Sequence, residues 1–263
     1  MASSTVRQSE KPFGTDHGLI HEVVVTGRSV GADEVFWTKL AHDADLFRKV
    51  VGVVNNDQDP TATSCSPSEA AAIMGDNFHG LEVTERHFSL SFNAKQKKIL
   101  ATVPFSPAVL QACSETHVLV ACASLSLMDV WEKQRELCYA KSDPWYGQPS
   151  EQFGSRKVKV AWQLVRKDLV PGSTSKTWDE QQALLSGDEL VPSASVLAQA
   201  IFLHYLETKE RLFQGIYART SDVGSDGRHV YLGGFDEDGL FVDGDWGDGR
   251  GSVLGLSSSR KFS

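Results

Sequence analysis

The sequence lacks several of the signals by which a function is commonly recognised. No stretch approaches the roughly 20 consecutive apolar residues of a membrane-spanning helix. The Gly-x-x-x-x-Gly-Lys-Ser/Thr pattern of a phosphate-binding loop is missing. Basic residues are in the minority, with 26 Lys and Arg against 34 Asp and Glu and a net charge of −8. The missing apolar stretch predicts that the chain has no membrane span. Because a general nucleic-acid binder presents a basic face, the acidic composition predicts no nucleic-acid partner.

Cysteine is also scarce. The chain has Cys65, Cys113, Cys122 and Cys138, with no Cys-x-x-Cys pair and no zinc spacing with histidine. Cys122 lies in an apolar run, which predicts a buried thiol rather than part of a disulfide framework. No cofactor is expected. The first residues have no apolar core of a signal peptide, so a cytoplasmic protein is predicted, and display on a cell or virion surface stays open.

Apolar periodicity and capping residues predict a mostly helical first half. Residues 1–18 are polar and expected to be loose. The region 19–155 is expected to be mostly helical, with N-caps at Asp33, Asn93 and Ser106. Its predicted elements are a strand at 21–25, helices at 33–54, 68–74, 81–88, 93–100, 106–113 and 127–139, and a buried strand at 117–123.

The second half of the chain has a different order of elements. A strand is predicted at 158–165. Thr177 begins a capping-box helix that is expected to run through Leu185, and Ser193 is predicted to cap a further helix. Short strands and turns follow. This order is typical of the α+β class, with the segment 156–263 expected to form a domain of its own.

The C-terminal part combines short apolar runs with a loop of small and acidic residues. The runs at 230–232, 240–242 and 253–256 predict strands, and the loop Asp243–Ser252 consists of Gly, Asp and Ser with one Trp and one Arg. Aromatic and Arg side chains among small residues are typical of binding surfaces. The predicted ligand-binding residues are Tyr231, Phe235, Asp236, Asp238, Phe241, Asp243, Asp245, Trp246, Asp248, Arg250 and Ser252.

Two alternatives compete for this stretch. In the first, Phe241 and Trp246 belong to the core and the Gly and Asp residues only form turns, as in a structural domain without a ligand. In the second, the aspartates bind calcium, which prefers oxygen ligands. The spacing does not fit an EF-hand, because Leu240 or Gly247 would occupy the fifth position. Solvated acidic turns are the default, and no metal is predicted.

A hydrolase is a further alternative. Residues 27–31 match Gly-x-Ser-x-Gly, with Ser29 as the candidate nucleophile between a predicted strand and a predicted helix. Asp222 and His229 follow in the order of a triad. However, no earlier strands are present to build the sheet of such an enzyme, and Gly and Ser are ordinary residues in a turn. The expectation is therefore a protein that is not an enzyme.

The order of motifs over residues 158–263 resembles a C-type-lectin-like fold, in the bacterial branch that includes formylglycine-generating-enzyme-like domains. The motifs are the Trp178-Asp-Glu180 helix start, the tripeptide Val191-Pro-Ser193, the strand Ala218–Ser221 and the terminal strand Leu256–Phe262. The catalytic members need a reactive cysteine pair in the C-terminal part. All cysteines here precede residue 139, so the resemblance does not imply catalysis.

One subgroup of this fold, of bacterial or phage origin, comprises the variable proteins of diversity-generating retroelements. In that subgroup, randomised adenines scatter AAC and AAT codons of Asn into codons for Gly, Asp, Ser, Arg, Tyr, Phe and other residues, but not for Trp, Glu, Gln, Lys or Met. The loop Gly244–Ser252 consists of this permitted set apart from Trp246, which would be a fixed anchor. The resemblance implies a hypervariable C-terminal face that binds a protein or cell-surface ligand.

Overall fold

The computed structural model describes residues 14–29, 31–44, 46–47 and 63–261, and the chain divides into two compact units at Asp59/Pro60. The first unit contains α1 (Gly14–Ser29) and α2 (Glu34–His42). Asp33 caps α2 as predicted, because its carboxylate accepts a hydrogen bond from the Phe36 amide at 2.8 Å. The helix ends at His42, earlier than expected, and the predicted remainder at 48–54 lies outside the described residues.

The strand predicted at 21–25 is wrong, since these residues lie within α1. A strand needs a neighbour to satisfy its main-chain donors and acceptors. The described residues of the first unit contain no strand that could pair with it, and a helix satisfies the same groups locally.

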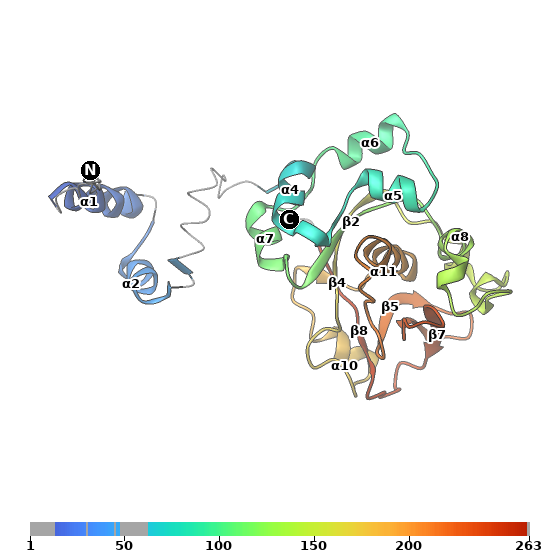
Figure 1. The fold of residues 1–263 in the computed structure, drawn as a ribbon. Helices are drawn as coiled ribbons and strands as arrows, with labels where there is room; N and C mark the ends of the chain where they lie inside the picture. Colours follow the sequence, from blue (N-terminus) through green and yellow to red (C-terminus); the bar gives the residue numbers. More distant parts are fainter. Residues whose placement is uncertain (1–13, 30, 45, 48–62, 262–263) are drawn as a thin grey trace, which may run out of the picture. The chain divides into compact units, whose positions relative to one another are not determined.

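The second unit is built on two mixed sheets (Figure 1), which confirms the α+β class. The five-stranded sheet has the order β1-β2-β3-β9-β4, and the four-stranded sheet has the order β7-β6-β5-β8. The strands are β1 (Phe78–His79), β2 (His117–Cys122), β3 (Ala161–Arg166), β4 (Glu189–Leu190), β5 (Tyr217–Val223), β6 (His229–Gly233), β7 (Phe241–Asp245), β8 (Leu254–Leu256) and β9 (Ser259–Arg260).

The helix α11 (Ala194–Thr208) packs between the two sheets. It contacts β2 and β3 of the first sheet and β5 and β6 of the second, and it is seen end-on between β2 and β5 in Figure 1. Its residues from Ala194 to His204 are all buried, so it is a core helix with apolar contacts on all sides. Ser193 caps it as predicted, accepting a hydrogen bond from the Val196 amide.

Short helices surround this core. They are α4 (Pro67–Met74), α5 (Leu81–His87), α6 (Ala94–Leu100), α7 (Pro107–Cys113), α8 (Leu127–Lys133), α9 (Gln152–Ser155) and α10 (Trp178–Gln182), with 3-10 turns at Gly75–Asn77, Arg135–Leu137 and Trp145–Gly147. The predicted caps Asn93, Ser106 and Thr177 are confirmed, the first and last as capping boxes. The helices α8 and α10 end earlier than predicted.

The predicted domain boundary between residues 155 and 156 is not a structural boundary. Strands β2 and β3 lie on either side of it and pair along their whole length, from His117↔Arg166 to Cys122↔Ala161. The C-terminal strand β9 in turn pairs with β3. Residues 156–263 therefore share one hydrophobic core with the helices before them. The change in local composition gave no sign of this long-range pairing.

The buried thiol predicted at Cys122 is confirmed, since its side chain is inaccessible to solvent. All four cysteines are buried and free. Within the part of the chain that the structure describes, no helix is long and apolar enough to cross a membrane.

Candidate ligand-binding face

The four-stranded sheet has one covered face and one open face. Side chains alternate along a strand, and Ala218, Val230 and Leu232 lie on the side that packs toward α11, where they are fully buried. On the opposite side, the register places Tyr231 between Arg219 and Asp243. This outer side is where the sheet presents half-exposed side chains.

An aromatic cluster occupies the outer side of β5, β6 and β7. The ring of Tyr217 lies 5.4 Å from Tyr231 and 6.1 Å from Phe241 between centroids. Tyr139, which is 55% exposed, contacts Phe241 at 5.2 Å. The rings of these three pairs meet edge to face, an arrangement favoured by the aromatic quadrupole. The cluster is a rigid, partly exposed apolar strip.

Tyr231 stays neutral at the centre of this strip. Burial and the nearby charge of Asp243 raise the pKa of its hydroxyl to about 12. The group therefore remains a hydrogen-bond donor over the whole physiological pH range.

The loop 246–253 follows β7 and displays alternate side chains. Trp246 is 54% exposed, and Asp248, Arg250 and Ser252 are also exposed. The intervening residues are glycines that are more buried. We call the outer residues Tyr217, Tyr231, Phe241 and Asp243, together with Trp246, Asp248, Arg250 and Ser252 of the loop, the display face.

A buried arginine holds the loop from beneath. Arg219 has no solvent exposure, and its guanidinium makes an ion pair with Asp245. One terminal nitrogen, Nη2, also donates to the carbonyl oxygens of Trp246 at 3.0 Å and Gly249 at 3.1 Å. The other, Nη1, donates to the side chain of Gln181 at 3.1 Å and to the carbonyl oxygen of Lys176. These partners offset the cost of burying a charge.

Main-chain donors outside the loop bind three more of its carbonyl groups. The amide of Trp178 donates to the Gly247 oxygen at 2.7 Å, the amide of Ser175 donates to the Gly251 oxygen at 2.9 Å, and the amide of Tyr217 donates to the Val253 oxygen at 2.8 Å. These bonds, like the two from Arg219 to Trp246 and Gly249, end on main-chain oxygens of the loop. They therefore do not depend on which side chains the loop carries.

Gly249 fills a space that no larger residue fits. A Cβ at this position would lie 2.2 Å from Oδ2 of Asp245. A Cβ at Gly247 would meet nothing closer than 3.5 Å, where it would contact His229. The two glycines look alike in the sequence, yet only Gly249 is constrained by the anchor.

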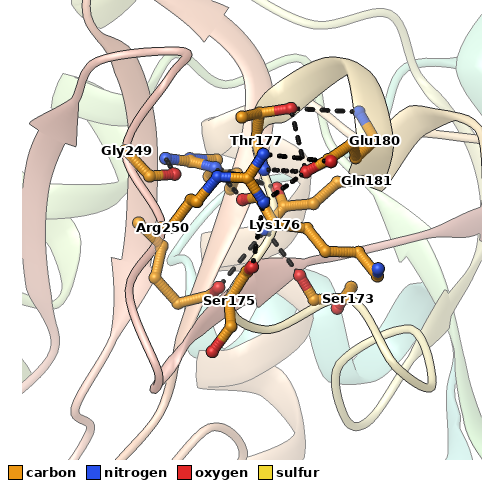
Figure 2. A network of polar contacts seen from close by, with 10 residues as sticks. Ser173, Ser175, Lys176, Thr177, Glu180, Gln181, Gly249 and Arg250 are labelled. Atoms are coloured by element: carbon orange, nitrogen blue, oxygen red, sulfur yellow. Dashed lines mark hydrogen bonds and ion pairs between the residues drawn. The ribbon is translucent and has the colours of Figure 1, made fainter.

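The start of α10 supports the loop from the side (Figure 2). Arg250 makes a bidentate pair with Glu180, at 2.8 and 3.0 Å, and reaches the Ser175 carbonyl oxygen. The hydrogen bond from the Thr177 amide, followed by the bond from Arg250, lowers the pKa of Glu180 to about 2. Arg250 remains about half exposed and can still reach a ligand.

The predicted site residues fall into four groups. Tyr231, Phe241, Asp243, Trp246, Asp248, Arg250 and Ser252 lie on the display face, partly or fully exposed. Asp236 and Asp238 are exposed in the turn between β6 and β7. Phe235 is a correction: it is fully buried against Phe202 and Tyr205. Asp245 belongs to β7 and serves the Arg219 anchor.

Several residues of the site were missed from the sequence. Arg219 was noted only as part of a strand, although a lone charge between Ala218 and Thr220 is a signal for a buried ion pair. Tyr217 was not singled out because its place on the open side depends on the register with β6. Tyr139 reaches Phe241 from a distant part of the chain, and local sequence carries no signal of that contact.

The geometry expected of a nucleophile elbow is wrong for Ser29. This residue ends α1, where its hydroxyl donates to the Thr26 carbonyl oxygen at 2.6 Å, and the next described element is α2. A helix therefore precedes the motif where an elbow requires a strand. In the second unit, Asp222 accepts hydrogen bonds from Arg156 and the Ala194 amide, and the ring of His229 stacks on Trp178.

Comparison with known proteins adds no relative. No family model, no curated protein and no solved structure matches the chain. Within the described part of the chain, no group of three or more His, Cys, Asp or Glu residues could hold a metal ion. The functional argument therefore rests on the geometry of the display face.

Proposed function

We propose that this protein is a non-enzymatic ligand-binding protein that presents the display face to a protein or cell-surface ligand. The observation that carries the proposal is the way the loop 246–253 is held. Arg219 and amides outside the loop bind the carbonyl groups of Trp246, Gly247, Gly249, Gly251 and Val253, while the alternate side chains of the loop are exposed to solvent. Such a loop keeps its shape when its side chains change.

The composition of the face supports binding over a plain turn. Trp and Tyr side chains give a large contact area at a low cost in conformational entropy, and Gly, Ser and Asp adapt to a partner. Trp246, the one aromatic residue of the loop 246–253, is 54% exposed, whereas a residue serving only the core would be buried. This favours the display function over a structural domain with no ligand.

The same geometry supports a finer proposal, that the protein is a variable protein of a diversity-generating retroelement with a C-type-lectin-like fold. The exposed loop residues other than Trp246 belong to the set that adenine randomisation supplies. A backbone anchored from outside would tolerate that variation. Trp246 would then be a fixed contact, and Arg219 and Gly249 would be fixed parts of the scaffold.

The genomic test is direct. The gene is expected to lie beside a reverse-transcriptase gene and a near-copy of its own 3′ end that differs at adenines. Sequences from related isolates should differ at the codons of Tyr231, Phe241, Asp243, Asp248 and Arg250. If neither the reverse transcriptase nor the near-copy is present, the retroelement proposal is wrong.

Binding itself is tested with the full chain and a phage-displayed random peptide library. The double variant Tyr231→Ala/Trp246→Ala removes the two central aromatic groups and should abolish capture of the selected peptides. The matched control is Ile99→Ala, which removes an exposed apolar side chain from α6. Peptides that bind both variants equally well would show that the display face is not a binding surface.

A further inference from the structure

The display face carries a surplus of negative charge. Its arginine, Arg250, pairs with Glu180, and the neighbouring Arg228 pairs with Asp226 at 2.7 Å and with Asp243 at 3.6 Å. The deeper pair of Arg219 and Asp245 also cancels. Among the described residues, Arg219, Arg228 and Arg250 are therefore paired with carboxylates of the protein itself, whereas Lys176 beside the loop and Arg211 beside Asp236 have no ion pair.

Uncommitted carboxylates lie at both ends of the aromatic strip. At the end nearest the loop, Asp248 and Asp179 are exposed, and Asp179 is close enough to influence His229. At the other end, in the turn that joins β6 to β7, Asp236, Glu237 and Asp238 are all exposed. Among the described residues, the side chains of Asp179, Glu237, Asp238 and Asp248 have no ion-pair partner. Between the two ends, β6 spans about 17 Å, at about 3.3 Å per residue.

We infer that the ligand of this face is a basic protein segment whose Lys or Arg side chains meet the carboxylates at the two ends, while its middle packs on Tyr217, Tyr231 and Phe241. The inference rests on the proposed function and names the chemistry of its partner. Cations also bind favourably over Tyr and Trp rings, which adds to the attraction of the carboxylates. An acidic partner would face uncompensated repulsion at both ends.

The ion pairs of Arg228 and Arg250 favour a basic ligand over an acidic one. A partner that supplied carboxylates would have to compete with Asp226 and Asp243 for Arg228, or with Glu180 for Arg250. Because such exchange gains little in water, Arg228 and Arg250 offer little attraction to an acidic ligand. A basic segment needs no exchange, since Asp179, Asp238 and Asp248 are open to solvent.

The test uses the same random peptide library, selected on the full chain at low salt. Peptides that bind in a manner dependent on Tyr231 and Trp246 are expected to be enriched in Lys and Arg. Their affinity should fall at least about tenfold in the variant Asp238→Lys/Asp248→Lys, which reverses one charge at each end. High salt should weaken binding in the same direction.

The control variant is Glu132→Lys, which reverses one exposed charge on α8. It should change the affinity less than about twofold, because screening limits the reach of a surface charge. The two charge-reversal variants should keep the circular dichroism and unfolding midpoint of the parent, since Asp238, Asp248 and Glu132 are exposed. This separates a lost contact from a lost fold.

The outcomes distinguish the inference from the proposal beneath it. Basic peptides whose binding weakens on charge reversal support the inference. Peptides that need Tyr231 and Trp246 but are neutral or acidic overturn the inference and leave the proposed function standing. If no selected peptide depends on the display face, both are wrong.

Discussion

The two sheets of the second unit treat buried polar groups in opposite ways. In the five-stranded sheet, β2 is buried along its whole length. The buried polar side chains of β1 and β2 include His79 and His117, and burial lowers the pKa of both, which keeps them neutral. In the four-stranded sheet, one side is open and the buried polar group is the charged Arg219, bound to acceptors from several segments. A closed sheet favours uncharged groups, whereas an open one can use a buried charge to shape a loop.

The histidines His79 and His204 illustrate how uncharged polar groups are buried at the five-stranded sheet. His204 bonds to His79 at 3.0 Å and to Glu210 at 3.0 Å, and both rings are 1% exposed. Since the Glu210 carboxylate accepts, neutral His204 donates from Nε2 and accepts at Nδ1 from Nε2 of His79. Nδ1 of His79 is left without a partner among the described residues. Burial lowers the pKa of both rings.

The largest effect is expected at the anchor. The substitution Arg219→Met should reduce the free energy of unfolding by about 3–5 kcal/mol, because it leaves Asp245 without its partner and the loop carbonyls without donors. Urea unfolding measures this. Arg228→Met is the matched control: its ion pairs are solvent-exposed, so it should cost less than about 1 kcal/mol. Similar losses for the two variants would show that Arg219 is not an anchor.

A pH titration tests the closed sheet. The pKa of His79 is lowered to about 3, first by burial and then by the charge of His204, so below pH 6.5 the unfolded chain binds a proton that the native state excludes. Stability should therefore fall as the pH drops from about 6.5 toward 3, by about 2–4 kcal/mol from this group. The measurement is unfolding by urea at a series of pH values.

The variant His79→Phe removes the titrating group. Its stability should change less steeply than that of the parent over this pH range, whatever its absolute stability. The substitution His21→Gln affects an exposed histidine in the first unit and should leave the slope for the second unit unchanged. Equal slopes in the parent and in His79→Phe would contradict the assignment.

A smaller effect is expected from the loop glycines. Gly249→Ala should cost about 1–3 kcal/mol, because the new methyl group collides with Asp245. In Gly247→Ala the new methyl group meets only ordinary van der Waals contacts. This substitution should lower the free energy of unfolding by less than about 1 kcal/mol, as is usual for a tolerated change at the surface. Comparing the two unfolding midpoints tests the anchor without touching any charged residue.

The smallest effect is expected where the display face is free to vary. Asp248→Ala and Ser252→Ala should each stay within about 0.5 kcal/mol of the parent in urea unfolding, because no hydrogen bond of the anchor uses their side chains. A larger loss at either position would show that the loop depends on its own side chains. The proposal that the loop keeps its shape when its side chains change would then be wrong.

Local patterns predicted much of the second unit. The caps Asn93, Ser106, Thr177 and Ser193 mark helix starts because each depends on a side chain bonding to a nearby amide. The apolar run at 117–123 was long enough to indicate a buried strand. The ends of α8 and α10 were predicted too far along the chain, since these helices stop at Lys133 and Gln182.

The candidate site was predictable only in part. The aromatic and acidic content of the C-terminal stretch indicated where to look, and most of those residues are exposed together. Phe235 could not be told from Tyr231, since both are aromatic residues near the end of the same predicted strand, and only the fold places one in the core. The contact of Tyr139 with Phe241 joins segments that the sequence keeps far apart.

The sequence by itself determined the class of the fold, the helix caps, the buried strand and the chemical character of the C-terminal stretch. These follow from local hydrogen bonds and from the period of apolar residues, which act over a few neighbours. The tertiary structure alone decided that β2 and β3 join the two halves in one core, and that Arg219 lies beneath the loop. Pairing register and burial are set by distant residues, so they exist only once the chain has folded.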